Sequence, residues 1–405
     1  MDHAEEKSSI TEKKRKAYSR GRKKRRNDLT KKVIVLAVII LAVIFGIRFI
    51  QSAKNKQKAT SEDGRTLVET QLSQITHLSF EVLSIEESED SMSLTEFEDA
   101  LQKLYDEGYC LMDVYDIVDT DTEGGYTYKE TFLFPEGKKP LILSQRDVCY
   151  PFDAAEEGVA GKMLLQDGKI ACQYTDSSGN TQTGDFDLVP ILESFLEEHP
   201  DFSYNGARGI LSFSGYCGIL GYRSSSYLAA EENNPYAESY GTFNTSKESK
   251  SAKEVLEALS QNGWHFASNG FAKDISYGSE YSIVEEDAQS WENEVKSIIG
   301  DTDIILLPRE TDIGSWKGYT EENSKYTLLK EKGFSFFFVG EQSTPYLLQV
   351  KSDYVRQTVF EINNNGDFAS LFADAQSVQE QTEEENIQES SSESSQSSLS
   401  ETVEE

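Results

Sequence analysis

The chain has 405 residues and a formal net charge of −32, and this charge is unevenly distributed. Residues 1–32 contain 13 Lys and Arg but only 5 Asp and Glu, which leaves about −40 on the remainder. Such a split predicts two compartments or two kinds of partner. The acidic remainder would repel a phosphate backbone, so nucleic acid is excluded as the expected partner.

An apolar segment follows the basic one. Residues 33–47 carry no charge, and the stretch reaches residue 50 if Arg48 snorkels to the interface. About eighteen residues is near the lower limit for a membrane-spanning helix. A cleaved signal peptide is the competing interpretation, but no small-residue cleavage site follows Phe49. We therefore predict a single-pass transmembrane signal anchor at 33–50, with residues 1–32 cytoplasmic and the main domain extracellular.

Composition divides the rest of the chain into three parts. Residues 51–75 are polar and predict a stalk, helical near 67–75, and residues 76–368 have the composition of a globular domain. Residues 375–405 are rich in Ser, Glu and Gln and poor in apolar side chains. We expect this last segment to be a disordered acidic tail.

The chain contains four cysteines, and their spacing fits no metal-binding motif: Cys110, Cys149, Cys172 and Cys217. In an oxidising compartment they could form two disulfides with three possible connectivities. As small buried apolar side chains they could equally stay reduced. The sequence leaves the disulfide state open.

The globular part alternates helix and strand signals. Apolar periodicity and capping residues predict helices that begin near Ser93, Asp187 and Ser251, and further helices around 284–298 and 326–329. Strands are predicted at 110–114, 140–144, 208–213, 264–268, 303–307 and 334–339, with a hairpin at 163–174 that turns at Asp167-Gly168. Repeated β-then-α units predict an α/β fold with a mainly parallel sheet, either a barrel or a doubly wound domain. In both folds, ligand sites lie at the carboxyl ends of strands.

Three predicted strands end in conspicuous polar segments, which read Gln145-Arg146-Asp147, Asn269-Gly270-Phe271-Ala272-Lys273 and Pro308-Arg309-Glu310. Together with other short motifs they resemble the polysaccharide deacetylases of the NodB-homology type, especially membrane-anchored bacterial members, over about residues 77–368. The other motifs are His77-Leu78, Asp201-Phe202-Ser203-Tyr204, Gly206-Ala207-Arg208-Gly209, the segment 215–223 and Gly263-Trp264-His265-Phe266-Ala267-Ser268. The resemblance implies an irregular (β/α) barrel.

In that family the first motif carries two aspartates, a general base and a metal ligand, and the second motif adds two histidine ligands. The resemblance places Arg146 at the base position, Asp147 at the metal aspartate, and Asn269 and Lys273 at the histidine positions. A guanidinium cannot accept a proton, and a charged lysine cannot bind a metal ion. We therefore predict that no catalytic residue is intact and that no cofactor is bound. An active member would use a divalent metal, Zn²⁺, Co²⁺ or Mn²⁺, to activate a water molecule.

The number of histidines supports this interpretation independently of alignment. The chain has only four, and no two of them have the His-x-x-x-His spacing. We expect Arg146 or Lys273 to form an ion pair with Asp147 in place of the missing cation. A possible ligand cleft would contain His77, Gln145, Asp147, Arg309 and Trp316.

These features predict a catalytically inactive surface protein that binds a cell-envelope glycan or an envelope protein through a deacetylase-like cleft. The alternative is an active metal-dependent carbohydrate N- or O-deacetylase with altered ligands, such as Asp147, His77 and Asn269. A different hydrolase acting in the same cleft is a third interpretation, but the chain has no G-x-S-x-G nucleophile elbow to support it.

Overall fold

The computed structural model describes residues 59–372, except for 62, 121, 123, 124, 128, 231–233, 235, 316 and 341–346. The predicted anchor at 33–50 and the predicted tail at 375–405 lie outside these residues. Within the described part, no helix has the length and apolar character needed to cross a membrane. The chain divides into two units, one ending at Leu67 and the other beginning at Val68. In the first unit, β1 (Ala59–Thr60) pairs antiparallel with the start of β2 (Thr66–Gln71).

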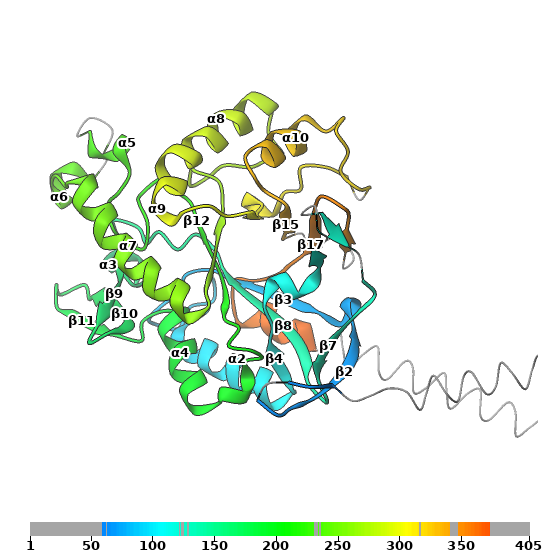
Figure 1. Ribbon diagram of the computed structural model, residues 1–405. Coiled ribbons are helices and arrows are strands. Elements are labelled where there is room, and N and C mark those ends of the chain that lie inside the picture. The colour runs from blue at the N-terminus through cyan, green and yellow to red at the C-terminus, as the bar shows by residue number, and fades with distance from the viewer. Residues whose placement is uncertain are drawn as a thin grey trace, which may run out of the picture. The chain divides into compact units, whose positions relative to one another are not determined.

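The second unit is built around a curled, mainly parallel sheet (Figure 1). Its strands, in their order across the sheet, are β18 (Phe360–Ile362), β3 (Thr76–Phe80), β8 (Lys139–Gln145), β12 (Gly209–Phe213), β13 (His265–Ser268), β14 (Ile304–Leu306), β15 (Phe336–Val339), β17 (Val355–Thr358) and β16 (Leu348–Val350). A tenth strand, β4 (Tyr109–Leu111), pairs with β8. The remaining strands are β5 (Asp119–Thr120), β6 (Tyr126–Thr127), β7 (Thr131–Pro135), β9 (Lys162–Gln166), β10 (Lys169–Thr175) and β11 (Thr181–Gly184).

The two ends of this sheet are joined by one extended segment. Strand β17 pairs in parallel with β15, and β18 pairs in parallel with β3. Only Val359 separates β17 from β18, and its backbone N–H donates to the carbonyl of Val339 at 2.9 Å. The sheet therefore curls until β18, its last strand along the chain, pairs with β3, its first strand along the chain.

Helices surround the outside of the curled sheet (Figure 1). The long ones are α2 (Leu94–Asp106), α4 (Leu188–Glu198), α7 (Thr245–Asn262), α8 (Tyr281–Trp291) and α10 (Ser324–Glu331), and the short ones are α3 (Ala154–Glu157), α5 (Ser226–Ala229), α6 (Ala237–Tyr240) and α9 (Ser297–Ile299). Helix α2 begins where the sequence predicts. The Ser93 hydroxyl accepts from the Glu96 N–H at 3.3 Å, and the Glu96 carboxylate accepts from the Ser93 N–H at 2.9 Å. This reciprocal capping box satisfies two donors at the helix start.

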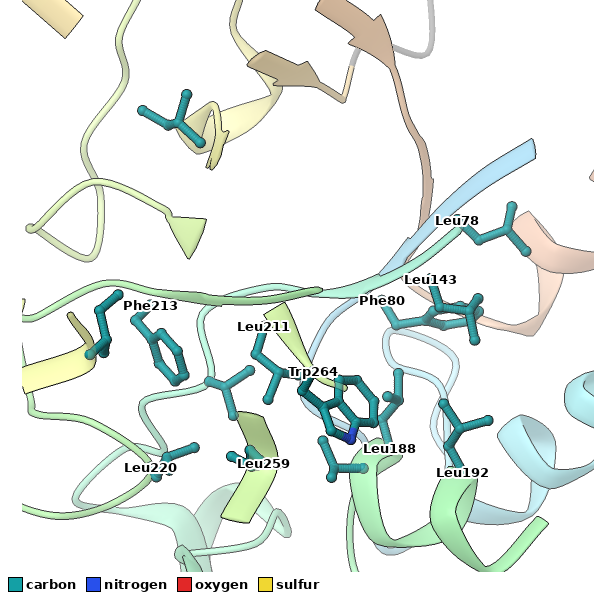
Figure 2. Close-up of a cluster of buried hydrophobic side chains, with 14 of the residues drawn as sticks. Leu78, Phe80, Leu143, Leu188, Leu192, Leu211, Phe213, Leu220, Leu259 and Trp264 are labelled. Carbon is teal, nitrogen blue, oxygen red and sulfur yellow. The ribbon is translucent and has the colours of Figure 1, made fainter. Parts of the chain in front are cut away.

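The hydrophobic core lies between the sheet and the helices. Figure 2 shows Leu143 and Leu211 of the sheet, with Trp264, packed toward Leu188 of α4 and Leu259 of α7. Full burial of each leucine contributes about 1.5–3 kcal/mol to folding. Because successive side chains of a strand point to opposite faces, the alternate residues of these strands line the inner side of the sheet.

Three sequence predictions about the elements are wrong in detail. Residues 66–71 form strand β2 rather than part of a helical segment, because they pair with strands on both sides. Helix α7 begins at Thr245 rather than near Ser251, because the Asn244 side chain caps it by accepting from the Lys247 N–H at 3.0 Å. The helix predicted at 284–298 is interrupted by a π-helical turn at Glu292–Lys296. The hairpin at Asp167-Gly168 is confirmed, with φ of 52° and 82° at its two turn residues.

Candidate functional site

A cleft of about 710 Å³ lies at the carboxyl ends of strands β8, β13 and β14. Its lining brings together five residues that the sequence analysis selected: Arg146, Asp147, Asn269, Lys273 and Arg309. They meet because parallel strands all end at the same edge of a sheet. Glu81, Glu157, Tyr216 and Asp274 are among the other lining residues. The wall is therefore rich in charged and polar groups of both signs.

Two residues predicted for the cleft do not line it, and this corrects the sequence analysis. His77 is the second residue of β3 and is fully buried, and its Nε2 is 3.0 Å from the Ser144 Oγ. Burial lowers the pKa of His77 to about 3, so the ring is neutral at physiological pH. Gln145 turns to the outer side of the sheet and donates to the Asp187 carboxylate at 2.8 Å. Trp316 lies outside the described residues.

Arg146 is held by an acidic partner that the sequence analysis did not identify. Its guanidinium forms an ion pair with the carboxylate of Glu361 from β18, and the two side chains are only 9% and 2% exposed. The predicted ion pair with Asp147 is therefore wrong for Arg146. The segment that closes the sheet supplies the counter-charge from a position more than two hundred residues along the chain.

Asp147 has a hydroxyl partner rather than a cationic one. Its carboxylate accepts a hydrogen bond from Ser214, and among the described residues it forms no ion pair. Burial raises the pKa of Asp147, although the Ser214 hydrogen bond and the more distant charge of Lys273 oppose the rise. The ion pair predicted with Lys273 is thus also wrong. A carboxyl whose protonation is favoured by burial has less need of a direct cation.

The Lys273 ammonium instead lies 5.7 Å from the centroid of the Tyr216 ring. Burial acts to lower the pKa of Lys273, but the carboxylates of Glu157 and Asp153 outweigh it, so the pKa is raised overall. Lys273 therefore remains charged, at a distance from its acidic neighbours. Nearby, the Asn269 Oδ1 atom is buried and has no hydrogen-bond partner in the described part of the chain.

Two buried carboxylates hold the loops that carry these side chains. Asp187 accepts from the Leu83 N–H at 3.1 Å, from Gln145 and from the Tyr150 hydroxyl, so it fixes both ends of the loop containing Asp147. Asp287 of α8 accepts from the backbone N–H groups of Phe271 and Ala272 at 2.8 and 2.9 Å. These bonds fix the loop between Asn269 and Lys273. These hydrogen bonds therefore hold in place the two loops that carry Asp147, Asn269 and Lys273.

Backbone strain is concentrated around the same cleft. Asp147, Tyr150 and Arg309 adopt left-handed φ values of 52°, 54° and 53°. Non-glycine residues in this region cost on the order of 1–3 kcal/mol each and persist only where the surroundings impose them. Within the second loop, Gly270 has φ of 75°, and a Cβ there would lie 2.8 Å from Ile275. Strain that gathers at one site is a feature of ligand clamps and reaction centres.

The side chains in this cleft do not fit a catalytic metal. The three aligned positions offer one carboxyl, one amide and one ammonium, and an ammonium cannot be a ligand. No group of three or more His, Cys, Asp or Glu side chains in the described ranges has an arrangement that could hold a metal ion. The alternative ligand set of Asp147, His77 and Asn269 is not assembled, since His77 is enclosed beside Ser144.

Comparison with known proteins gives structural neighbours only. No protein-family model matches the sequence, and no curated protein matches it. Among solved structures, the chain is similar to the Streptococcus pyogenes deacetylase PplD in complex with acetate, with 10% identity and a TM-score of 0.39 over 75% of this chain and 97% of that one. It is also similar to BC0361, a polysaccharide deacetylase from Bacillus cereus, with 12% identity and a TM-score of 0.33 over 77% and 74% of the two chains.

Proposed function

We propose that this chain is a membrane-anchored, extracytoplasmic protein with the irregular (β/α) barrel of the polysaccharide deacetylases, and that it binds glycan without deacetylating it. The observation that supports this most is the pairing of Arg146 with Glu361. A guanidinium neutralised by a buried carboxylate fills the position where the reaction requires a proton acceptor. In this proposal the position of the family's general base is occupied by a paired arginine.

The polar groups that remain suit a neutral or weakly charged saccharide. Asn269 offers an amide whose Oδ1 has no hydrogen-bond partner among the described residues, and Lys273 offers an ammonium beside the Tyr216 ring. Sugars present hydroxyl and acetamido groups that pair with amide and ammonium side chains, while their apolar faces pack on aromatic rings. We propose that a cell-envelope glycan occupies this cleft. An envelope protein is the alternative ligand.

Binding of the full chain to insoluble cell-wall glycan and to acetylated chito-oligosaccharides tests this proposal. Loss of one well-formed hydrogen bond corresponds to about a tenfold loss of affinity. We expect such a loss for Asn269→Ala and for Lys273→Ala, and no change for Glu286→Gln, which lies on the exposed face of α8. Glycan binding that survives both cleft substitutions would show that the cleft is not the binding site.

A further inference from the structure

Two buried cysteines lie close together beside the cleft, and one of them, Cys149, lines it. The Arg223 guanidinium donates to the carbonyl oxygen of Cys217 at 3.4 Å and also to that of Tyr150, the residue that follows Cys149. Cys149 and Cys217 are 2% and 1% exposed, and the Cys217 Sγ is 3.4 Å from the carbonyl oxygen of Tyr150. Both thiols are present in their reduced form. Nothing in the proposed glycan site requires such a pair.

The backbone brings the two cysteines together independently of their side chains. Gly221 donates its N–H to the carbonyl of Cys149 at 2.9 Å, and Leu220 donates to the carbonyl of Val148 at 3.1 Å. The Arg223 guanidinium bonds to the carbonyl of Tyr150 at 2.7 Å. These bonds hold the two loops side by side, so a cross-link between them would join segments that are already neighbours.

The other two cysteines are engaged elsewhere. The Cys110 thiol lies 3.5 Å from the carbonyl oxygen of Asp201, and Cys172 lies 3.5 Å from the Tyr150 hydroxyl. We propose that Cys149 and Cys217 form a disulfide that ties the Asp147 loop to the Ser214 loop, and that Cys110 and Cys172 remain thiols. This selects one pairing from those that the sequence leaves open, and it goes beyond the proposed glycan binding.

The cross-link needs a disulfide-bearing oxidant, such as a thiol–disulfide exchange protein or oxidised glutathione. One cysteine loses its proton and attacks the donor disulfide, which forms a mixed disulfide and releases the first donor thiol. The second cysteine then displaces the second donor thiol as the Cys149–Cys217 bond forms. Two protein thiols become one disulfide, and one donor disulfide becomes two thiols. Cys149 and Cys217 are almost completely enclosed once the chain has folded, so oxidation belongs to the folding stage.

The decisive experiment refolds the reduced full chain in detergent with a mixture of oxidised and reduced glutathione. Free thiols are then alkylated in denaturant, and the digested chain is mapped by mass spectrometry. We expect a cross-linked peptide containing Cys149 and Cys217 in most folded molecules, with Cys110 and Cys172 alkylated. Alkylation of all four cysteines, or a pairing of Cys149 with Cys110 or Cys172, would overturn the proposal. Because glutathione is supplied, the result does not depend on where the chain resides or on which glycan it binds.

Variants add a second measurement. Reduction of the oxidised chain should lower the midpoint of thermal unfolding by about 5–10 °C, because the cross-link closes a long loop. Cys217→Ser should abolish this shift, whereas the matched variant Cys110→Ser should retain it. A reduction-dependent shift of the same size in Cys217→Ser would contradict the pairing. If Cys217→Ser does not fold, the peptide map of the unsubstituted chain decides the question alone.

Discussion

Arg146 and Glu361 form a buried ion pair that connects the end of β8 to β18, the strand that returns the curled sheet to β3. The pair therefore lies where the fold closes and where the cleft begins. In the family that the sequence resembles, the position of Arg146 belongs to the general base. Here the same position carries an arginine that is paired with a buried carboxylate, and we expect this pair to have a structural role.

Removal of one partner should be strongly destabilising. Arg146→Ala leaves Glu361 buried without its counter-charge, and we expect the free energy of unfolding to fall by about 3–5 kcal/mol. The matched control is Arg309→Ala. Arg309 is paired with Asp274 at the cleft rim, where the side chains are 57% and 75% exposed, so its loss should cost less than about 1 kcal/mol. Urea unfolding of both variants measures the difference, and equal losses would contradict the structural role of Arg146.

Asp287 should control the order of the loop between Asn269 and Lys273. Asp287→Asn replaces one acceptor oxygen with an NH₂ group that faces a backbone donor, so we expect a loss of about 1–3 kcal/mol and faster hydrogen exchange at Phe271 and Ala272. Glu286→Gln changes the adjacent, exposed residue of α8 and serves as the control. Unchanged exchange at both amides in Asp287→Asn would show that the carboxylate does not hold this loop.

His77 should make the fold sensitive to acid. Its folded-state pKa of about 3 lies below its ordinary value of 6.5, so the unfolded chain binds the proton more tightly. Stability is therefore lost as the pH falls below about 6.5, by about 2–3 kcal/mol over the first two pH units. His77→Gln has no group to titrate and should remove this part of the pH dependence. Urea midpoints of both chains across this range test the prediction, and parallel curves would refute it.

The metal site should be recoverable if the aligned positions are correct. Asn269→His with Lys273→His adds two imidazoles to the cleft beside Asp147, which gives three groups able to bind Zn²⁺ or Co²⁺. We expect the double variant to bind one Co²⁺ with a visible absorption band, and the unsubstituted chain to give no such band. Asn269→Gln with Lys273→Gln is the matched control without imidazole. Absence of cobalt binding by a folded double-histidine variant would show that these side chains do not converge.

The sequence predicted the parts of the site that depend on local pattern. The strand ends before Arg146, Asn269 and Pro308 follow from short apolar runs that give way to polar residues, and the structure places all three at one edge of the sheet. Glu361 could not be identified in this way. Strand β18 has only three residues, and its pairing with β3 joins distant parts of the chain.

The local sequence pattern also could not predict where individual side chains lie. Gln145 precedes Arg146 directly but faces the outer core, because alternation along β8 sends neighbouring residues to opposite sides. His77 resembles a candidate ligand in the sequence, yet it lies near the start of its strand, away from the carboxyl end that borders the cleft. Asp287 holds the second loop from a helix that is not part of any recognised motif. In all three cases the position of the side chain depends on contacts between distant parts of the chain.

Acetate release tests the central claim most directly. The full chain, the Asn269→His/Lys273→His variant and a metal-free blank are incubated with acetylated chito-oligosaccharides in the presence of Zn²⁺, Co²⁺ or Mn²⁺. Because Arg146 cannot act as a base and Lys273 cannot bind a metal, we predict that the unsubstituted chain releases acetate no faster than the blank. Metal-dependent turnover by the unsubstituted chain, with metal bound near one equivalent, would contradict the account.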